Sequence, residues 1–354
     1  MIEQTFKNAF GYSAAISGFT PGRVNLIGEH TDYNGGMVLP TALTLGVTVA
    51  LSPRRDNEVY IYSDKFEGLA KRSLNQDATG HWSDYILGAI RLAKEQHYLT
   101  GGADIAVETN LPFGAGISSS AAITVGVLKQ SRDHANIDTP DKDIAVLARR
   151  VENEFIGMPC GIMDQMAVAL ANPTQALALN TQTLEYTLID LPQNYHMAVI
   201  HSGIYRQLNE GRYKERKEEC DAVKTKLGHQ NICQISNAEF DSLSSLNPLL
   251  RRRAKHCMTE HRRTLKAIDC LQSDDINQFG QLMIESHISM RDDFEITLPE
   301  IDRLVEDAVN FGAIGARLTG GGFGGCIVAA VPRYKLKPWT ERLLAQHSTA
   351  FAVA

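Results

Sequence analysis

The chain has 354 residues, which is long for one hydrophobic core, so one large or two closely packed domains are expected. Hydrophobic residues make up 44% and charged residues 21%, which is typical of a soluble globular protein and does not indicate disorder. The formal net charge of −6 removes the long-range attraction that nucleic acid or an anionic membrane would need, so small-molecule partners are favoured.

The six cysteines are scattered, with no C-x-x-C pair and no histidine at metal-ligand spacing. A disulfide framework or a zinc site is therefore not expected. The N-terminal stretch "MIEQTFKNAFGYSAAISG" lacks the basic end and apolar run of a secretory signal, and no apolar segment is long enough to span a bilayer. These features predict a protein of the reducing cytoplasm.

The first half alternates short β-rich runs with helical stretches. The predicted strands include "VTVALS" (47–52), "EVYIYS" (58–63) and "ADIAVET" (103–109). A helix is predicted over 141–157, with Thr139 as N-cap and Pro140 in its first turn. Its apolar residues recur at helical spacing, namely Ile144, Leu147, Val151 and Phe155.

From 205 to 310 the pattern is mainly helical and highly charged. The basic run at 251–253 favours a solvated helix face over a nucleic-acid patch, because acidic residues are interleaved with it. The glycine cluster "TGGGFGG" (319–325) precedes an apolar strand, "CIVAAVP". We place a domain boundary between 185 and 200, giving domains of 1–190 and 191–354.

The stretch "LPFGAGISSSAAITVG" (111–126) lies where a predicted strand passes into an Ala-rich helix. The N-terminus of a helix has free N–H groups and a positive dipole end, which attract phosphate. Gly114 and Gly116 would let the backbone approach the anion, and the serines add hydroxyl donors. An N-capped helix after a tight turn is the alternative that these residues leave open.

The stretch "PGRVNLIGEHTDYNGG" (21–36) follows an apolar strand pattern with six consecutive side chains able to hydrogen-bond, from Glu29 to Asn34. So dense a polar run suits a hydroxyl-rich ligand, because each sugar hydroxyl both donates and accepts. A solvated loop is the alternative, and polarity alone favours it.

Together these motifs resemble those of the galactokinases, within the superfamily of galactokinase, homoserine kinase, mevalonate kinase and phosphomevalonate kinase. "GRVNLIGEHTDYN" is similar to the galactokinase signature, "GAGISSSAA" to the shared ATP loop and "TGGGFGGC" to the C-terminal glycine motif. "CGIMDQ" (160–165) and "SMRDDFEIT" (289–297) also resemble galactokinase segments. The order and spacing match over residues 8 to about 345.

The resemblance implies a role for each matching residue. The ATP phosphates would be held by Gly114, Ala115, Gly116, Ile117, Ser118, Ser119, Ser120, Gly321 and Gly322. The sugar would be bound by Glu29, His30, Thr31, Asp32, Gly161, Asp164 and Tyr213. Mg²⁺ would be held by Ser120 and Glu152, and the transfer itself would involve Arg23 and Asp164. From the residues alone, Glu152 could instead be solvated or pair with Arg149, and Asp164 could cap the helix after Gly161.

The implied fold is a two-domain α/β (α+β) structure. It would have an N-terminal α/β sandwich and a C-terminal layer of helices on an antiparallel sheet, with the active site between them. Two departures from the family stand out. The chain stops at "AFAVA", where the family continues with a further strand, so "AFAVA" must replace that strand or leave an edge open. "HSGIYRQL" (201–208) also replaces an Asn-Ser start, which bears on sugar specificity.

The implied reaction is transfer of the γ-phosphoryl group of ATP to the anomeric hydroxyl of α-D-galactose. Positioning and charge neutralisation carry most of such a transfer, with Mg²⁺ and Arg23 supplying the charge. Asp164, paired with Arg23, would be a weak base that orients the hydroxyl and accepts its proton late. An N-acetylgalactosamine kinase, a non-catalytic sugar and ATP sensor, and another kinase of the superfamily are the alternatives. No nucleic-acid or membrane partner is expected, and a monomer is predicted.

Overall fold

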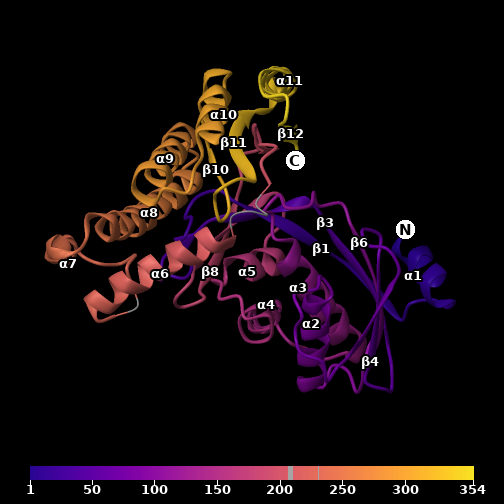
Figure 1. Ribbon diagram of the computed structural model, residues 1–354. Coiled ribbons are helices and arrows are strands. Elements are labelled where there is room, and N and C mark those ends of the chain that lie inside the picture. Colours follow the sequence, from indigo (N-terminus) through magenta and orange to yellow (C-terminus); the bar gives the residue numbers. More distant parts are fainter. Residues whose placement is uncertain (206–209, 230) are drawn as a thin grey trace. The chain divides into compact units, whose positions relative to one another are not determined.

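The computed structural model describes residues 1–205, 210–229 and 231–354, and these divide into two compact units (Figure 1). Unit 1 contains Met1–Arg23, Leu43–Leu111 and Ser118–Ala171. Unit 2 contains Val24–Ala42, Pro112–Ile117 and Asn172–Ala354. Unit 2 thus takes two segments from the first third of the chain, whereas the division into 1–190 and 191–354 stays a prediction.

Unit 1 is built on a sheet in which β5, β4, β6 and β3 are neighbours and β1 also pairs with β3. β4 and β6 run parallel, and the β4–β5 and β3–β6 pairs are antiparallel. The elements of the unit, in chain order, are α1 (Ile2–Phe10), β1 (Ile16–Asn25), β3 (Pro40–Pro53), β4 (Glu58–Ser63), β5 (Leu69–Ser73), α2 (Asp84–Glu95), β6 (Ala103–Thr109), α3 (Ser119–Ala135), α4 (Asp141–Arg150), the π-helical turn η1 (Val151–Ile156) and α5 (Met163–Leu170). The predicted strands at 47–52, 58–63 and 103–109 are therefore confirmed.

Helices cover both faces of this sheet (Figure 1). Successive side chains of a strand point to opposite faces, so each face has its own set of side chains for a helix to pack against. On one face, Phe6 of α1 packs against Ala50 of β3 and Ala106 of β6. On the other face lies α3, where Gly126 comes so close that an added Cβ would be 3.1 Å from Val49. The alternation of Val49 and Ala50 thus fixes which helix covers which side.

The helix predicted over 141–157 forms at that place, as α4 followed directly by η1. The predicted N-cap is wrong. Pro140 occupies the N-cap position with extended backbone (ψ 144°), and no side chain caps the helix. Thr139 instead accepts a hydrogen bond from Tyr98 through its hydroxyl.

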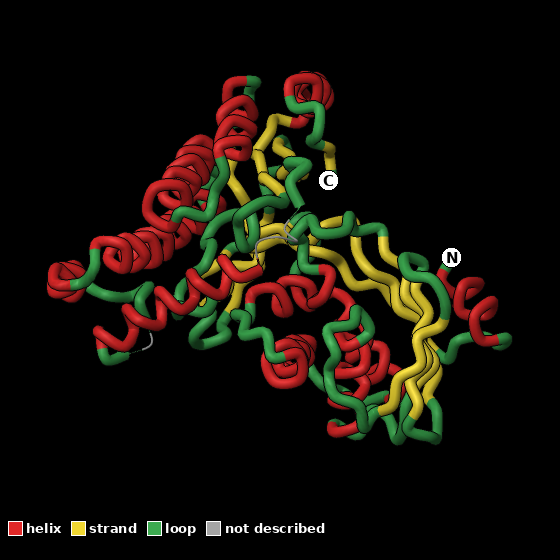
Figure 2. Tube along the Cα trace, viewed as in Figure 1, coloured by secondary structure: helices red, strands yellow, loops and turns green. Residues whose placement is uncertain are grey.

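Unit 2 contains two small sets of paired strands and most of the helices (Figure 2). β7 pairs with β2 and β8, and a second sheet has the order β10-β11-β9-β12. The elements are β2 (Met37–Val38), β7 (Gln175–Asn180), β8 (Tyr186–Asp190), β9 (Tyr195–His201), α6 (Glu210–Leu227), α7 (Asn237–Ser242), η3 (Leu243–Ser245), α8 (Pro248–Gln272), α9 (Ile276–Ser289), η4 (Met290–Phe294), α10 (Pro299–Asn310), β10 (Gly315–Leu318), β11 (Cys326–Pro332), η5 (Arg333–Lys335), α11 (Leu336–Gln346) and β12 (Phe351–Ala352). The helical pattern expected from 205 to 310 and the strand after the glycine cluster are confirmed.

The helices of unit 2 cover its antiparallel sheet with amphipathic faces. In α10, the buried residues Ile301, Leu304, Val305 and Ala308 recur at helical spacing. They join the core formed with β10 and β11, to which Trp339 of α11 also belongs. None of the helices that the structure describes combines the length and apolar composition of a membrane-spanning segment.

The basic run at 251–253 is a solvated helix face only in part: the side chains of Arg251 and Arg252 are 41% and 43% exposed, but Arg253 is fully buried. Its guanidinium donates to Glu219 at 2.6 Å, to Glu295 at 2.7 Å and to the carbonyl of Asp293 at 2.7 Å. Arg252 also pairs with Glu295. Carboxylates from distant segments, Glu219 of α6 and Glu295, thus neutralise Arg253 and Arg252 within the protein.

The C-terminal "AFAVA" contributes a short strand to the antiparallel sheet. Phe351 and Ala352 pair antiparallel with His201 and Ile200 of β9 as strand β12. Val199 then donates its N–H to the carbonyl of Ala354 at 2.7 Å. The segment therefore pairs with the C-terminal end of β9, residues 199–201. Residues 206–208 of "HSGIYRQL" lie outside the described residues.

Candidate active site

Unit 1 places Asp164 between a cation and a hydroxyl. Arg23, in β1, donates through Nε to Oδ1 and through Nη2 to Oδ2 of Asp164, both at 2.8 Å. Ser118 donates to Oδ2 at 2.6 Å. Such a two-pronged contact fixes the plane of the carboxylate. Asp164 lies in the first turn of α5, where Ile162 is the N-cap residue, so the capping alternative is wrong.

The predicted phosphate loop has the backbone form that an anion site needs. Gly114, Gly116 and Ser118 all have positive φ, at 66°, 69° and 65°. Ser118 is the N-cap residue of α3, yet its side chain makes no cap hydrogen bond and goes to Asp164 instead. The first-turn N–H groups of α3 are therefore not capped by this side chain, which favours the anion-binding interpretation over a simple capped helix.

The two apolar residues of the loop anchor it. Ala115 and Ile117 are each 1% exposed. In unit 2, the Ala115 carbonyl lies 3.3 Å from the thiol of Cys326, at the start of β11. Buried side chains thus alternate with residues of positive φ along the loop.

Glu152 lies in η1 and is buried, so the solvated alternative is wrong. Burial raises the pKa of its carboxyl to about 7, and the nearby negative charge of Asp164 adds to the rise. Gln165 donates to Oε1 at 2.8 Å, and this bond, not one to Arg149, orients the side chain. Two carboxylates thus repel each other in unit 1, which is the electrostatic setting that a cation would relieve.

In unit 2, the polar run after Gly28 forms a compact loop that we call the signature loop, residues 28–36. Glu29 is 2% exposed, and its carboxylate accepts from Asn25 Nδ2 at 3.1 Å and from the N–H of Gly320 at 2.7 Å. Arg317 lies 3.6 Å away. Glu29 therefore ties the signature loop to the C-terminal glycine motif.

His30 and Tyr213 come together in an aromatic cluster. Their rings are 5.4 Å apart, and the ring of Phe294 lies 4.7 Å from that of His30. The Nδ1 atom of His30 lies 2.6 Å from the hydroxyl of Tyr33. The structure thus brings two of the residues predicted for the sugar, 183 positions apart in the sequence (213 − 30), into one group.

The other predicted binding residues divide between the units. Thr31 is fully buried, and its hydroxyl lies 2.8 Å from the carbonyls of both Gly28 and Met37, so it shapes the signature loop. Asp32 is half-buried in the same loop of unit 2, whereas Gly161 is buried in unit 1 just before α5. The roles of these residues in binding stay predictions.

The C-terminal glycine motif turns through a run of positive φ values. Gly320 has φ 83° and Gly322 has φ 84°, and a Cβ at Gly322 would lie 2.6 Å from Ile296. No larger residue fits there. Gly321 lies between them and is half-buried, so the motif gives backbone groups close to the signature loop, and its contact with ATP stays a prediction.

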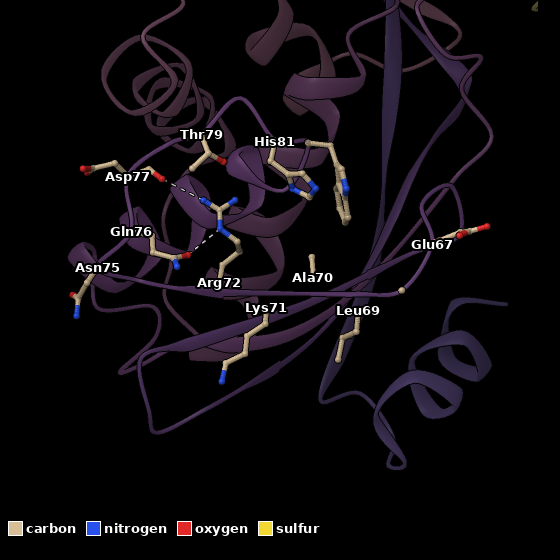
Figure 3. A pocket seen from close by; sticks show the side chains of 12 residues that line it. Glu67, Leu69, Ala70, Lys71, Arg72, Asn75, Gln76, Asp77, Thr79 and His81 are labelled. Atoms are coloured by element: carbon tan, nitrogen blue, oxygen red, sulfur yellow. Dashed lines mark hydrogen bonds between the residues drawn. The ribbon is translucent and has the colours of Figure 1, made fainter.

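A cavity of about 720 Å³ lies in unit 1 beside β5 and the segment that leads to α2 (Figure 3). Arg72 lies in it with its guanidinium satisfied by Gln76, Ser83, Asp84 and the carbonyl of Asp77. The described lining of the cavity includes none of the residues predicted for ATP or sugar.

Several residues that support the site escaped prediction from the sequence. The hydrogen bond from the Ser118 hydroxyl to Asp164 was not foreseen, and the role of Ser118 at the phosphates stays a prediction. Arg317, His256 and Glu260 lie against the signature loop and are fully buried. One signal in the sequence could have found them: they are charged or polar residues at positions that the helical or strand pattern assigns to the core. Buried charges need partners, so such residues are expected to bond other parts of the chain.

The family models match most of the chain in the order that the motifs predict. The galactokinase galactose-binding signature matches residues 4–53, the GHMP kinases N terminal domain residues 84–172 and the GHMP kinases C terminal domain residues 267–338. A galactokinase of Actinobacillus pleuropneumoniae serotype 3 is 39% identical over 347 residues, covering 95% of this chain and 90% of the relative. The chain belongs to the galactokinase family.

Further relatives and solved structures agree with membership of this family of ATP-dependent sugar kinases. A galactokinase of Glaesserella parasuis serovar 5 is 38% identical, covering 98% of this chain and 93% of the relative. The crystal structure of Lactococcus lactis galactokinase complexed with galactose matches with a TM-score of 0.91 and 31% identity, covering 99% of this chain and 96% of that one. Mevalonate kinase of Methanococcus jannaschii, at 22% identity and a TM-score of 0.69, shares the fold. The predicted fold class is confirmed.

Proposed function

We propose that this protein transfers the γ-phosphoryl group of ATP to the anomeric hydroxyl of α-D-galactose, giving galactose 1-phosphate and ADP. The observation that carries the proposal is the position of Asp164, a carboxylate fixed by Arg23 and by the residue that opens α3. A positioned acceptor for a hydroxyl proton thus adjoins a helix N-terminus that its N-cap side chain does not cap, which suits phosphate.

The chain's own residues account for the main steps. Arg23 places a positive charge where negative charge develops on the transferred phosphoryl group. Asp164 orients the anomeric hydroxyl and accepts its proton once the oxygen has begun to bond to phosphorus, because that bond makes the hydroxyl proton acidic. The Ser118 hydroxyl holds Asp164 in place through the 2.6 Å hydrogen bond.

Glu152 and Ser120 fit the chemistry of a magnesium site. Mg²⁺ prefers carboxylate and hydroxyl oxygens and is commonly bound through one or two protein ligands together with phosphates. The described residues contain no group of three His, Cys, Asp or Glu side chains that could hold a metal by themselves. The mutual repulsion of Glu152 and Asp164 favours a cation there. When bound, Mg²⁺ neutralises charge on the phosphates.

We expect Glu152→Gln to stabilise unit 1 in metal-free solution as the pH rises. Because the folded pKa of Glu152, about 7, lies above its ordinary value of 4.5, the folded state holds the proton more tightly than the unfolded state. The protonated Glu152 therefore contributes its full stabilisation below about pH 4.5, and this contribution is lost as the pH rises through about 7. By pH 6 the free energy of unfolding of wild type has fallen by about 2 kcal/mol for this reason. The glutamine cannot ionise. Urea denaturation in EDTA, followed by the fluorescence of Trp82 in a Trp339→Phe background, measures the difference.

The same variant should bind nucleotide more weakly, and this defect should shrink as magnesium is raised, since a hard cation prefers an anionic ligand. An affinity defect that is indifferent to magnesium would make Glu152 a structural residue. A wild type and variant with parallel stability curves from pH 4.5 to 7 would contradict the raised pKa.

An ADP-release assay over galactose, N-acetylgalactosamine, glucosamine, arabinose and mevalonate tests the proposed reaction. We expect galactose to give the highest kcat/KM. A preference for N-acetylgalactosamine would support the nearest alternative. The glycines at 35 and 36 do not themselves leave open space for it, because an added Cβ would lie 3.0 Å from Asn231 at Gly35 and 2.6 Å from Thr31 at Gly36. Binding of galactose and ATP without turnover would indicate a sensor, which the presence of both Glu152 and Asp164 disfavours.

We expect Asp32→Ala to lose most of the preference for galactose over glucose. In wild type, a sugar that lacks the hydroxyl contacted by Asp32 would leave this carboxylate without a partner, which typically costs about 1–3 kcal/mol. Alanine removes that penalty and with it the preference. KM for ATP at saturating sugar should change little. The matched control is Asp241→Ala, since the Asp241 side chain is 76% exposed on α7. An unchanged galactose-to-glucose ratio with normal sugar affinity would remove Asp32 from the sugar site.

The proposed reaction needs only small-molecule substrates, galactose and ATP. A monomer and a cytoplasmic location stay predictions. Gel filtration with light scattering distinguishes a monomer of 39.0 kDa from larger assemblies.

A further inference from the structure

One face of α8 holds the backbone of the signature loop. His256, Glu260 and Thr264 follow one another at intervals of four residues, so they lie along one side of the helix. All three are fully buried. Thr264 also lies so near the loop that a Cβ added to Gly28 would be 3.1 Å from its hydroxyl.

Glu260 accepts hydrogen bonds from two consecutive backbone N–H groups of the loop. Its Oε1 lies 3.0 Å from the nitrogen of Gly28 and 3.4 Å from that of Glu29. Burial alone would raise the pKa of Glu260, but the charges of Arg263 and Arg317 hold it at about 2. The side chain is therefore ionised, and it accepts hydrogen bonds only.

His256 holds the carbonyl on the other side of the same residue. Its Nε2 lies 3.1 Å from the Glu29 carbonyl, and its Nδ1 lies 2.9 Å from the hydroxyl of Ser289. Burial lowers the pKa of His256 to about 4, so the ring is neutral near pH 7. A carbonyl only accepts, so Nε2 must carry the single ring proton and Nδ1 must accept from Ser289.

These contacts matter because the loop has an unfavourable backbone conformation. His30 has φ 59°, in the left-handed region that non-glycine residues rarely adopt. Gly28, two residues before it, has φ 99°. His256 and Glu260 together satisfy the peptide groups on both sides of Glu29, and the ring of Phe294 lies 4.5 Å from that of His256 and 4.7 Å from that of His30.

We propose that His256 and Glu260 are positioning residues for the sugar: by holding the peptide groups of Glu29, they keep Gly28 and His30 at the positive φ values that present the side chains of the signature loop. The inference rests on the proposed function, in which this loop binds galactose. Without these bonds the free loop populates other backbone forms, and its apparent affinity falls by the fraction that remains competent. Bound sugar restores the loop, so the rate of the bound complex changes little.

The test compares His256→Leu with His256→Gln. Leucine removes the donor to Glu29, and we expect the dissociation constant for galactose and its KM to rise about tenfold, with kcat within about threefold and ATP affinity unchanged; tenfold corresponds to about 1.4 kcal/mol. Glutamine can place an N–H near the position of Nε2, so it should return the KM to within about threefold of wild type. Calorimetry measures sugar binding independently of turnover.

Trp339→Phe is the matched control, because it also removes one buried side-chain hydrogen bond to a backbone carbonyl, that of Ala308 at 2.8 Å, in the same unit. It should lower the unfolding midpoint about as much as His256→Leu does, but leave the galactose affinity unchanged. If His256→Leu does not fold, Ser289→Ala tests the same contact more mildly, by removing the partner of Nδ1, and should raise the KM two- to fivefold.

A galactose affinity that is normal in both His256→Leu and Ser289→Ala would overturn the proposal, as would an equal rise in the KM of ATP and galactose. A fall in kcat without a change in sugar affinity would also overturn it. Failure of the proposed reaction looks different: wild type would then bind galactose without releasing ADP, while the calorimetric comparison of variants would still decide the role of α8.

Discussion

Asp164→Asn should reduce kcat by at least about 10²-fold, which is the lower end of what a positioned proton acceptor contributes. ATP affinity should stay nearly unchanged. The amide has the shape of the carboxylate, so it can still accept from Arg23 or Ser118 through its one oxygen. It cannot take a proton at neutral pH, and it leaves the buried guanidinium of Arg23 without its anionic partner. Steady-state ADP release and nucleotide binding measure the two quantities.

Ser118→Ala is the control for this prediction. It removes the 2.6 Å hydrogen bond to Asp164 and keeps the carboxylate, so we expect kcat to fall by less than about tenfold. If Asp164→Asn turned over at a near-normal rate, Asp164 would have no part in the chemistry. If both variants lost activity equally, the position of the carboxylate would matter more than its charge.

The sequence was sufficient to predict elements whose pattern is local. Strand β6 and helix α3 on either side of the phosphate loop follow from short apolar runs and an Ala-rich segment. The strand after the glycine cluster follows from seven consecutive apolar or small residues, all of which are buried in β11. In these cases neighbouring residues carry the whole signal.

The supporting contacts of the signature loop could not be predicted in this way. Glu29 bonds the backbone of Gly320, 291 positions away, and Glu260 bonds Gly28, 232 positions away. Hydrogen-bond partners that far apart depend on how helices and strands pack, and no local pattern specifies that. Ser118 shows the same limit within a motif, because the turn at φ 65° decides that its hydroxyl meets Asp164.

The expectation of a solvated face at 251–253 holds for Arg251 and Arg252 but not for Arg253, and the cause is related. Three consecutive residues of a helix point in directions about 100° apart, so one charged run can be both solvated and buried. Arg251 and Arg252 are half-buried, whereas Arg253 points into the unit toward Glu219 of α6. Charge alone did not distinguish them, and the amphipathic phase of α8 could have done so.

Arg253→Met should lower the free energy of unfolding of unit 2 by about 3 kcal/mol. Breaking a buried ion pair by removing one partner typically costs about 3–5 kcal/mol, because the other charge stays buried. The lower end applies, since Glu219 keeps Arg216 at 2.6 Å and Glu295 keeps Arg252 at 2.6 Å. What is lost outright is the donor to the Asp293 carbonyl. Urea denaturation followed by the fluorescence of Trp339 in a Trp82→Phe background measures unit 2 by itself.

The neighbouring Arg251→Met is the matched control for that change. Arg251 is 41% exposed and lies 4.0 Å from Asp241, whose side chain is 76% exposed. Exposed ion pairs contribute about 0–1 kcal/mol, so this variant should unfold nearly as wild type does. Equal losses for the two variants would mean that the cost lies in the helix and not in the buried network. In a double-mutant cycle, Glu219→Gln should cost less in the Arg253→Met background than in wild type, because only Arg216 then loses a partner, and purely additive losses would contradict the coupling of Glu219 and Arg253.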